Sequence, residues 1–229
     1  MRRRLKDVEA DFKRTEADLA EARKLLNQYD NHLEREKVDA ARRALDRLNN
    51  LATLLEDKGR LEEAEPLYRR SLGIGEKTLG MNHPSVATRL NNLARLLVNT
   101  DRAVEAEPLY RRALEIDKKA LGLEHPNVAI RLNNLACLLQ KTGRFNEAEH
   151  VYNRALAISE KALGPDHSAV AIRLGNLASL LGDMDRFGEA EPLYQRAVKI
   201  FRASLGEDHP NTKTVIANYE EFKAMRGEA

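Results

Sequence analysis

Four histidines are the first residues of this sequence whose side chains could do chemistry. An imidazole can bind a metal or transfer a proton, but a metal site needs several ligands close together. These histidines recur at intervals of 42 residues, and three of them precede a proline: His83, His125, His167 and His209. At that spacing they should fall in successive links of a repeat, and no cluster of cysteines or carboxylates accompanies them. We therefore expect structural turn histidines, with neither a bound metal nor a cofactor.

Two other patterns suggest catalysis without completing a catalytic site. Residues 73–77 read Gly-Ile-Gly-Glu-Lys and resemble a phosphate loop, but they lie inside a predicted helix, where the next copy reads Glu-Ile-Asp-Lys. Cys137 is the only cysteine, so no disulfide can form within the chain, and the sequence places no base beside it to activate the thiol. Because no nucleophile is paired with a base, we do not expect an enzyme.

Asparagines form a pattern that suits binding. They occupy the same position in four copies of the repeat: Asn50, Asn92, Asn134 and Asn176. An asparagine side chain both donates and accepts hydrogen bonds, so it can pair with the backbone of an extended peptide whatever the peptide's sequence. The alternative is that some of these amides bridge adjacent helices. We expect ligand contact first at Asn92 and Asn134, with Asn91 and Asn133 at the margin of the same surface.

Arginines form a second series with the same spacing: Arg47, Arg89, Arg131 and Arg173. Together with Arg95 and Lys141 they would make the middle of the binding surface cationic, which favours an acidic peptide through charge-assisted hydrogen bonds. The alternative is a structural role, in which each arginine pairs with a repeated glutamate: Glu65, Glu107, Glu149 and Glu191.

An internal repeat positions all of these residues. One leucine in each copy opens a Leu-Asn-Asn-Leu-Ala segment, or Leu-Gly-Asn-Leu-Ala in the last copy, and these leucines are 42 residues apart: Leu48, Leu90, Leu132 and Leu174. Such an array stacks one supersecondary unit on the next and presents a long surface. The repeat therefore indicates a binding protein.

Each copy reads as two helices. In the second copy, apolar residues at helical spacing predict a helix from Pro84 to about residues 99–102 and another that stops at Leu121, where Gly122 suits a left-handed cap. Alanines recur where the two helices must approach closely. On a helical wheel, the leucines of the first helix lie opposite a polar side, which is the expected groove: Thr88, Asn92, Arg95 and Asn99.

Four features recur together: the Leu-Asn-Asn-Leu-Ala segment, the Gly-Arg turn at 59–60 and 143–144, the Glu-Ala-Glu-Pro-Leu-Tyr-Arg-Arg-Ala-Leu segment at 105–114 and the Leu-Gly-x-x-His-Pro link. In these features the chain resembles tetratricopeptide repeat proteins of the 42-residue class found in kinesin light chains and in many bacterial proteins. The resemblance covers about residues 41–222. It implies a right-handed superhelix of hairpins, with the first helix of each hairpin lining a concave groove that holds peptides.

The resemblance also carries a role onto particular residues. Related repeat proteins use an asparagine at the matching position of the first helix to hold bound peptide, which implies that role for the four-membered asparagine series. Kinesin light chains also use a lysine inside the groove, where this chain has Thr88, Ile130 and Ile172. The preference of those proteins for a motif of tryptophan and acidic residues is therefore not expected here.

Composition agrees with a binding surface of mixed charge. The chain has 38 basic and 36 acidic residues, a formal net charge of +2, so it has no general attraction for nucleic acid. Charged residues interrupt the N-terminus where a secretory signal would need an apolar run, and no stretch is apolar enough to span a bilayer. We expect a cytoplasmic protein that does not bind membranes.

The two ends depart from the repeat. Residues 1–40 contain no glycine or proline, and Leu5, Phe12, Leu19, Leu26 and Leu33 are seven apart, as in a coiled coil that could form a homodimer. A degenerate hairpin that caps the first repeat is the favoured alternative. We divide the chain into an N-terminal helical segment at 1–40, four repeats at 41–210 and a C-terminal capping helix at 211–229.

The fold class expected from these observations is an all-α solenoid of antiparallel helix hairpins. The expected function is that of a scaffold or adaptor, which binds peptide segments of partner proteins in the concave groove. Two other functions remain open: a regulatory sensor module of a larger signalling ATPase or protease, and a structural homo-oligomer formed through residues 1–40.

Overall fold

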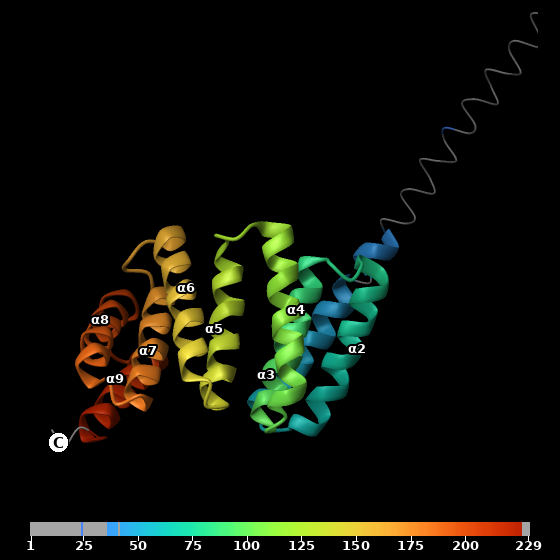
Figure 1. Ribbon diagram of the computed structural model, residues 1–229. Helices are drawn as coiled ribbons and strands as arrows, with labels where there is room; N and C mark the ends of the chain where they lie inside the picture. The colour runs from blue at the N-terminus through green and yellow to red at the C-terminus, as the bar shows by residue number, and fades with distance from the viewer. Residues whose placement is uncertain (1–23, 25–35, 41, 226–229) are drawn as a thin grey trace, which may run out of the picture.

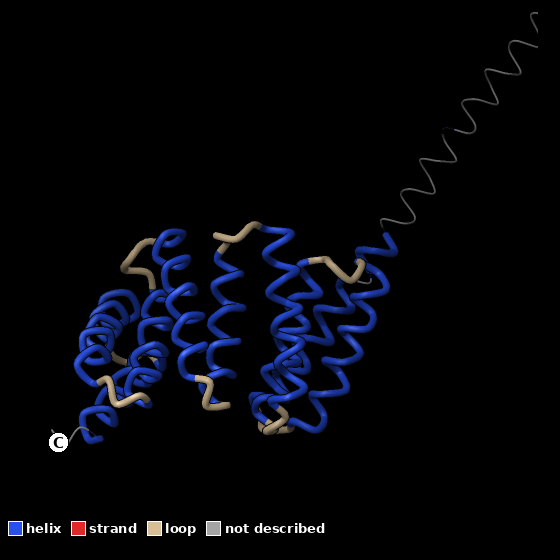
Figure 2. The backbone as a smooth tube through the Cα atoms, in the orientation of Figure 1, coloured by secondary structure: helices blue, strands red, loops and turns tan. Residues whose placement is uncertain are grey.

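The computed structural model describes residues 24, 36–40 and 42–225. All regular structure in this part of the chain is helical (Figure 2). A helix over residues 42–57 is followed by eight more: α2 (Leu61–Leu79), α3 (Pro84–Asn99), α4 (Ala103–Leu121), α5 (Pro126–Lys141), α6 (Phe145–Leu163), α7 (Ser168–Asp183), α8 (Phe187–Leu205) and α9 (Pro210–Met225). The predicted coiled coil or capping hairpin at 1–40 lies almost entirely outside the described residues.

The helices form hairpins that follow the sequence repeat. The first helix of a pair, here called the A helix, has 16 residues in α3, α5 and α7, and the second, the B helix, has 19 in α4, α6 and α8. Figure 1 shows the hairpins side by side in a row, and α9 packs against α8 and α7 at its end. The prediction is confirmed: the fold is an all-α, right-handed superhelical solenoid of antiparallel helix hairpins.

The repeated histidines begin the A helices. His125 is the N-cap of α5, and its Nδ1 accepts a hydrogen bond of 3.1 Å from the backbone N–H of Asn127. A helix leaves its first N–H groups without partners, so this contact stabilises the start of the helix. The other three histidines make the same contact two residues ahead: His83 with Ser85, His167 with Ala169 and His209 with Asn211. The predicted structural role is therefore an N-cap.

A glycine ends each complete B helix, but not in the predicted conformation. Gly122 has φ 90° and ψ 161°. The positive φ is one that residues with a side chain rarely adopt, while the ψ lies far from the left-handed helical region. The backbone therefore leaves the helix in an extended form that leads directly to the next histidine cap. The prediction of a left-handed cap at Gly122 is therefore wrong, although the positive φ of this residue still favours glycine.

Small and aromatic side chains fill the space within each hairpin. The alanines predicted at the close approach of the two helices are all fully buried: Ala52, Ala94, Ala136 and Ala178 on the A helices, and Ala64, Ala106, Ala148 and Ala190 on the B helices. One tyrosine of each B helix is also buried: Tyr68, Tyr110, Tyr152 and Tyr194. Alanine lets the backbones approach, and the large ring then fills the remaining volume.

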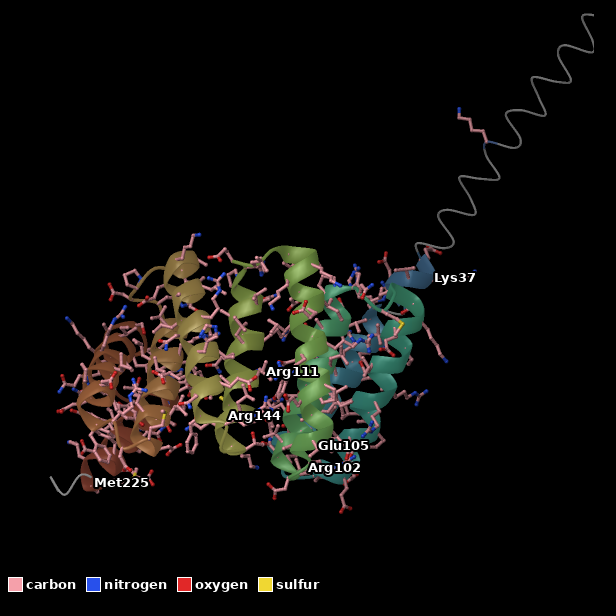
Figure 3. All side chains as sticks on the ribbon, viewed as in Figure 1. Lys37, Arg102, Glu105, Arg111, Arg144 and Met225 are labelled. Atoms are coloured by element: carbon pink, nitrogen blue, oxygen red, sulfur yellow. The ribbon has the colours of Figure 1, made fainter. Side chains whose placement is uncertain are left out.

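Ion pairs connect successive B helices. Arg102, at the N-cap of α4, binds Glu105 of its own helix at 2.7 Å and Glu65 of α2 at 2.7 Å. Figure 3 shows Arg102 beside Glu105 at the start of α4. The hydrogen bond from Arg102 lowers the pKa of the Glu105 carboxyl below its ordinary value. Later repeats keep the contact to the preceding B helix: Arg144 with Glu107 at 2.9 Å and Arg186 with Glu149 at 2.6 Å.

The A helices lie on the inner side of the curved stack. Among the described helices, α3 and α5, α5 and α7, and α7 and α9 bring several pairs of Cα atoms within 8 Å of each other, whereas successive B helices do not come as close. A stack whose one side is more closely spaced than the other must curve toward the close side. The exposed side of the A helices therefore faces the concave surface. No described helix combines the length and apolar character that crossing a membrane would require.

The N-cap role of the histidines can be tested in the middle of the stack. We expect His125→Ala to lower the free energy of unfolding by about 1 kcal/mol, because the N–H of Asn127 loses its acceptor. His125→Asp should keep most of the stability, since a carboxylate caps the same N–H. The measurement is urea unfolding followed by circular dichroism. Equal losses in the two variants would argue against capping.

Candidate peptide-binding surface

The exposed face of the A helices is the side that the helical wheel predicts. On α3, Leu90, Leu93 and Leu97 are buried, whereas Thr88 and Asn99 are exposed. We call this exposed side the inner face. It comprises four positions in each repeat: Asp46, Asn50, Thr53 and Asp57; Thr88, Asn92, Arg95 and Asn99; Ile130, Asn134, Cys137 and Lys141; Ile172, Asn176, Ser179 and Asp183.

The asparagines of the inner face bond to one another across the repeats. Asn134 Nδ2 donates to Oδ1 of Asn91 on the preceding A helix at 2.8 Å. The same bond joins Asn92 to Asn49 at 2.8 Å and Asn176 to Asn133 at 2.9 Å. Each pair is 43 residues apart, one repeat plus one residue. This is the bridging arrangement that was the alternative to ligand contact, and it holds the amides in a fixed orientation.

The two asparagines of a pair differ in exposure. Asn91 and Asn133 are buried, at 5% and 7% relative exposure, so they lie beneath the surface and accept the cross-repeat bonds. Asn92, Asn134 and Asn176 are half-buried, and no hydrogen bond among the described residues involves their Oδ1 atoms. Asn50 is exposed. The half-buried amides therefore present an acceptor to the inner face, and Asn92 and Asn134 also present one remaining N–H, which in Asn176 contacts Cys137 Sγ at 3.9 Å.

Three of the repeated arginines, Arg89, Arg131 and Arg173, are buried between the helices, whereas Arg47 is exposed. Arg131 is 5% exposed; its Nε donates to Asp117 Oδ2 at 2.8 Å and its Nη2 to Thr88 Oγ1 at 3.0 Å. Arg89 bonds to Ser71, Asp46 and the carbonyl of Ser85, and burial lowers the pKa of its guanidinium. The glutamates proposed as alternative partners pair elsewhere: Glu65 with Arg69 and Arg102, Glu107 with Arg111 and Arg144, and Glu149 with Arg186.

Arg173 lacks the counter-ion of its equivalents. Arg131 binds Asp117 and Thr88. The equivalent positions in the next repeat, beside Arg173, are Ser159 and Ile130. Ser159 donates to the Ala155 carbonyl, and among the described residues Arg173 makes one hydrogen bond, from Nη1 to the Ala169 carbonyl at 3.2 Å. Its Nε is buried and has no partner in the part of the chain that the structure describes. Burial lowers the pKa of the Arg173 guanidinium, because a charge is unfavourable where no counter-ion compensates it.

The two other cations of the predicted site are already paired. Arg95 Nη1 lies 2.9 Å from Glu56 Oε1, and Glu56 is a buried carboxylate on the preceding A helix. Lys141 Nζ lies 2.7 Å from Asp101 Oδ1 and donates to the Val98 carbonyl at 2.9 Å. Both contacts cross from one repeat to the next. The sequence analysis missed Glu56 and Asp101 as partners, because a wheel drawn for one helix says nothing about its neighbour.

Cys137 lies exposed on the inner face, but its sulfur has close neighbours. The Tyr152 hydroxyl lies 3.0 Å from Sγ, and Nδ2 of Asn133 and of Asn176 both lie 3.9 Å away. Desolvation by these surroundings raises the pKa of the thiol above its ordinary value. A smaller thiolate fraction makes the cysteine less reactive, which agrees with the unreactive role expected for it.

These features define a class of protein: a helical repeat protein whose A helices present a continuous, mostly polar face. The tetratricopeptide repeat family matches residues 43–119, 90–161, 132–203 and 170–221. The chain belongs to this family, whose repeats generally mediate contacts between proteins.

Solved structures share this fold. A kinesin light chain-like protein of Podosopora anserina with nearly identical TPR-like repeats is 26% identical, with a TM-score of 0.66 over 80% of this chain and 87% of that one; a point variant of it gives 0.67 over the same shares. BtubC (BKLC) from P. vanneervenii has 23% identity and a TM-score of 0.66 over 85% of each chain, which shows a common fold alone. The sequence has no match among curated proteins.

The difference between Arg131 and Arg173 predicts opposite effects of two substitutions. Asp117→Ser should lower the free energy of unfolding by about 3 kcal/mol, because it leaves Arg131 buried without its counter-ion. Ser159→Asp should raise it by about 1 kcal/mol, because it supplies Arg173 with the carboxylate it lacks. Urea unfolding of both variants measures this. Destabilisation by Ser159→Asp would contradict the assignment.

The raised pKa of Cys137 predicts slow alkylation. At neutral pH the folded protein should react with iodoacetamide several-fold more slowly than a cysteine in an unstructured peptide, because less thiolate is present. The rate should increase with pH and approach its plateau at a higher pH than that of the peptide. The urea-unfolded chain is the matched control and should react at the peptide's rate. An equal rate in the folded chain would contradict the prediction.

Proposed function

We propose that the inner face binds an extended peptide segment of a partner protein, and that Asn92, Asn134 and Asn176 pair with the backbone of that peptide. The observation that carries the proposal is the cross-repeat bond of 2.8–2.9 Å that each of these amides makes. It leaves an acceptor on each side chain, and a donor on Asn92 and Asn134, in a regular series. A peptide backbone also offers alternating donors and acceptors, so the two series suit each other.

Preorganisation favours this proposal over an inner face of solvated polar residues alone. A flexible side chain loses rotamer freedom when a ligand fixes it, and this loss opposes binding. The cross-repeat bonds already fix the three amides before any ligand arrives. Asn91 and Asn133 then contribute as the buried acceptors that hold the series in place, while Asn50 offers an exposed amide at the N-terminal end.

The cations of the candidate site support a preference for acidic peptides less strongly in the structure than the sequence alone indicated. Arg89 and Arg131 are buried, and Arg95 and Lys141 are paired with Glu56 and Asp101. An incoming carboxylate would therefore compete with an existing partner both at the half-buried Arg95 and at the exposed Lys141. We propose that backbone pairing dominates affinity and that Arg95 and Lys141 contribute a smaller, salt-dependent preference for acidic residues.

We further propose that the protein acts as a scaffold or adaptor and not as an enzyme, in the cytoplasm, without binding nucleic acid or membranes. A homodimer through residues 1–40 stays a prediction, because most of these residues lie outside the described part of the chain. No observation on the described residues favours the sensor module of a larger ATPase or protease.

The test uses a display library of random peptides selected against the full chain. We expect the double variant Asn92→Ala, Asn134→Ala to lose about tenfold or more in affinity for the selected peptides, because two backbone contacts disappear. Asn153→Ala, at an exposed position of the B helix α6, is the matched control and should keep the wild-type affinity. Circular dichroism shows whether each variant is folded.

Alkylation of Cys137 gives an independent readout. A peptide lying on the inner face covers this exposed cysteine, so a saturating selected peptide should slow its alkylation further. Unchanged affinity in the double variant together with unchanged alkylation would move the binding site away from the inner face.

A further inference from the structure

The asparagine series is broken at the C-terminal end of the stack. The two asparagines of each cross-repeat bond are 43 residues apart, as in Asn134 with Asn91 and Asn176 with Asn133. At this spacing, Asn218 of α9 should donate to residue 175. Residue 175 is a glycine and offers no acceptor. Asn218 is exposed, and no hydrogen bond among the described residues involves its side chain. Asn218 therefore differs from Asn92, Asn134 and Asn176 in having no cross-repeat partner among the described residues.

A hollow of about 220 Å³ lies at this break, between α7, α8 and α9. Ala171, Phe201 and Val215 are buried residues that line it, and Ile172 lines it while remaining 38% exposed. Asn176 and Asn218 contribute amides to the same lining. None of its lining residues is charged, although 32% of the chain is.

Packing does not demand the glycine. A Cβ atom added at Gly175 would meet Val215 Cγ2 at 3.5 Å, which is ordinary van der Waals contact, and no other atom outside the helix lies within 4 Å. Gly175 also lies within the regular helix α7, where any residue fits the backbone conformation. The missing side chain at this position therefore leaves open the space that an asparagine occupies in the preceding repeats.

We propose that this hollow binds one uncharged apolar side chain, branched aliphatic or aromatic, of an extended peptide from a partner protein, while Asn176 and Asn218 pair with the peptide backbone on either side of it. The inference rests on the proposed function and names the residue class that the C-terminal end of the inner face selects.

Size and polarity both support this occupant. An apolar cavity of about 150 Å³ holds a molecule of the size of benzene, so this hollow has room for one such side chain. A charged side chain would lose its hydration here without finding a counter-ion. The unpaired amide of Asn218 and the Oδ1 of Asn176, which no hydrogen bond among the described residues involves, suit a peptide group, which has one donor and one acceptor.

Filling the hollow tests the proposal. Gly175→Asn places there the residue that the three preceding repeats carry, supplies Asn218 with an acceptor and favours the helix more than glycine does. Gly73→Asn is the matched control, since Gly73 also lies inside a helix, α2, with no atom within 4 Å of an added Cβ. Asn218→Ala changes an exposed residue and serves as a second variant that leaves the packing intact.

The probes are the peptides that the display library yields against the full chain. We expect them to share an apolar residue at one position, to bind Gly175→Asn about tenfold or more weakly, and to bind Gly73→Asn like the wild type. Asn218→Ala should weaken binding several-fold, and replacing the shared apolar residue of the peptide with aspartate should abolish binding to the wild type.

The results separate this inference from the proposed function. Peptides that lose affinity for the Asn92 and Asn134 double variant but bind Gly175→Asn and Asn218→Ala normally would overturn the apolar site and leave the peptide groove standing. Peptides without a shared apolar residue would do the same. A library that yields no binding peptide would overturn both proposals.

Discussion

The stack depends on one short hydrogen bond, which joins the asparagines of successive A helices. Because an asparagine side chain is short, the bond forms only where two helices lie close together and in one register, offset by one repeat plus one residue. Arginine and glutamate have long side chains, and they connect the B helices at a wider spacing, as between Arg102 and Glu65. The short side chains therefore connect the closely spaced inner side of the curved solenoid, and the long side chains connect its wider outer side.

The same bond couples architecture to recognition. A half-buried amide that bridges two repeats keeps part of its hydrogen-bonding capacity for the inner face, so the residues that set the spacing of the A helices also set the spacing of the groups offered to a ligand. The spacing of any bound backbone must match this series. Selectivity for particular peptide side chains then depends on positions where the asparagine series is interrupted, as it is at Gly175.

Sequence reasoning succeeded where a repeat determines its own structure. The alternation of leucine and polar residues gave the buried and exposed sides of α3, and the alanines marked the close approach of paired helices correctly. It was less successful where a neighbouring repeat supplies the partner. The bond of Arg89 to Asp46, the pairing of Arg95 with Glu56 and the one-residue offset of the asparagine pairs all involve residues about 40 positions apart. A single helical wheel contains no information about such contacts.

The two sides of the stack also differ in chemistry. The inner connections between Asn91 and Asn134 and between their equivalents are uncharged, whereas the outer connections, such as Arg144 with Glu107, are ionic and partly exposed to solvent. Salt weakens exposed ion pairs and leaves amide hydrogen bonds nearly unchanged. Added salt should therefore loosen the connections between B helices while the asparagine bonds between A helices persist, and on the inner side it should act only through the ion pairs that accompany those bonds, such as Lys141 with Asp101.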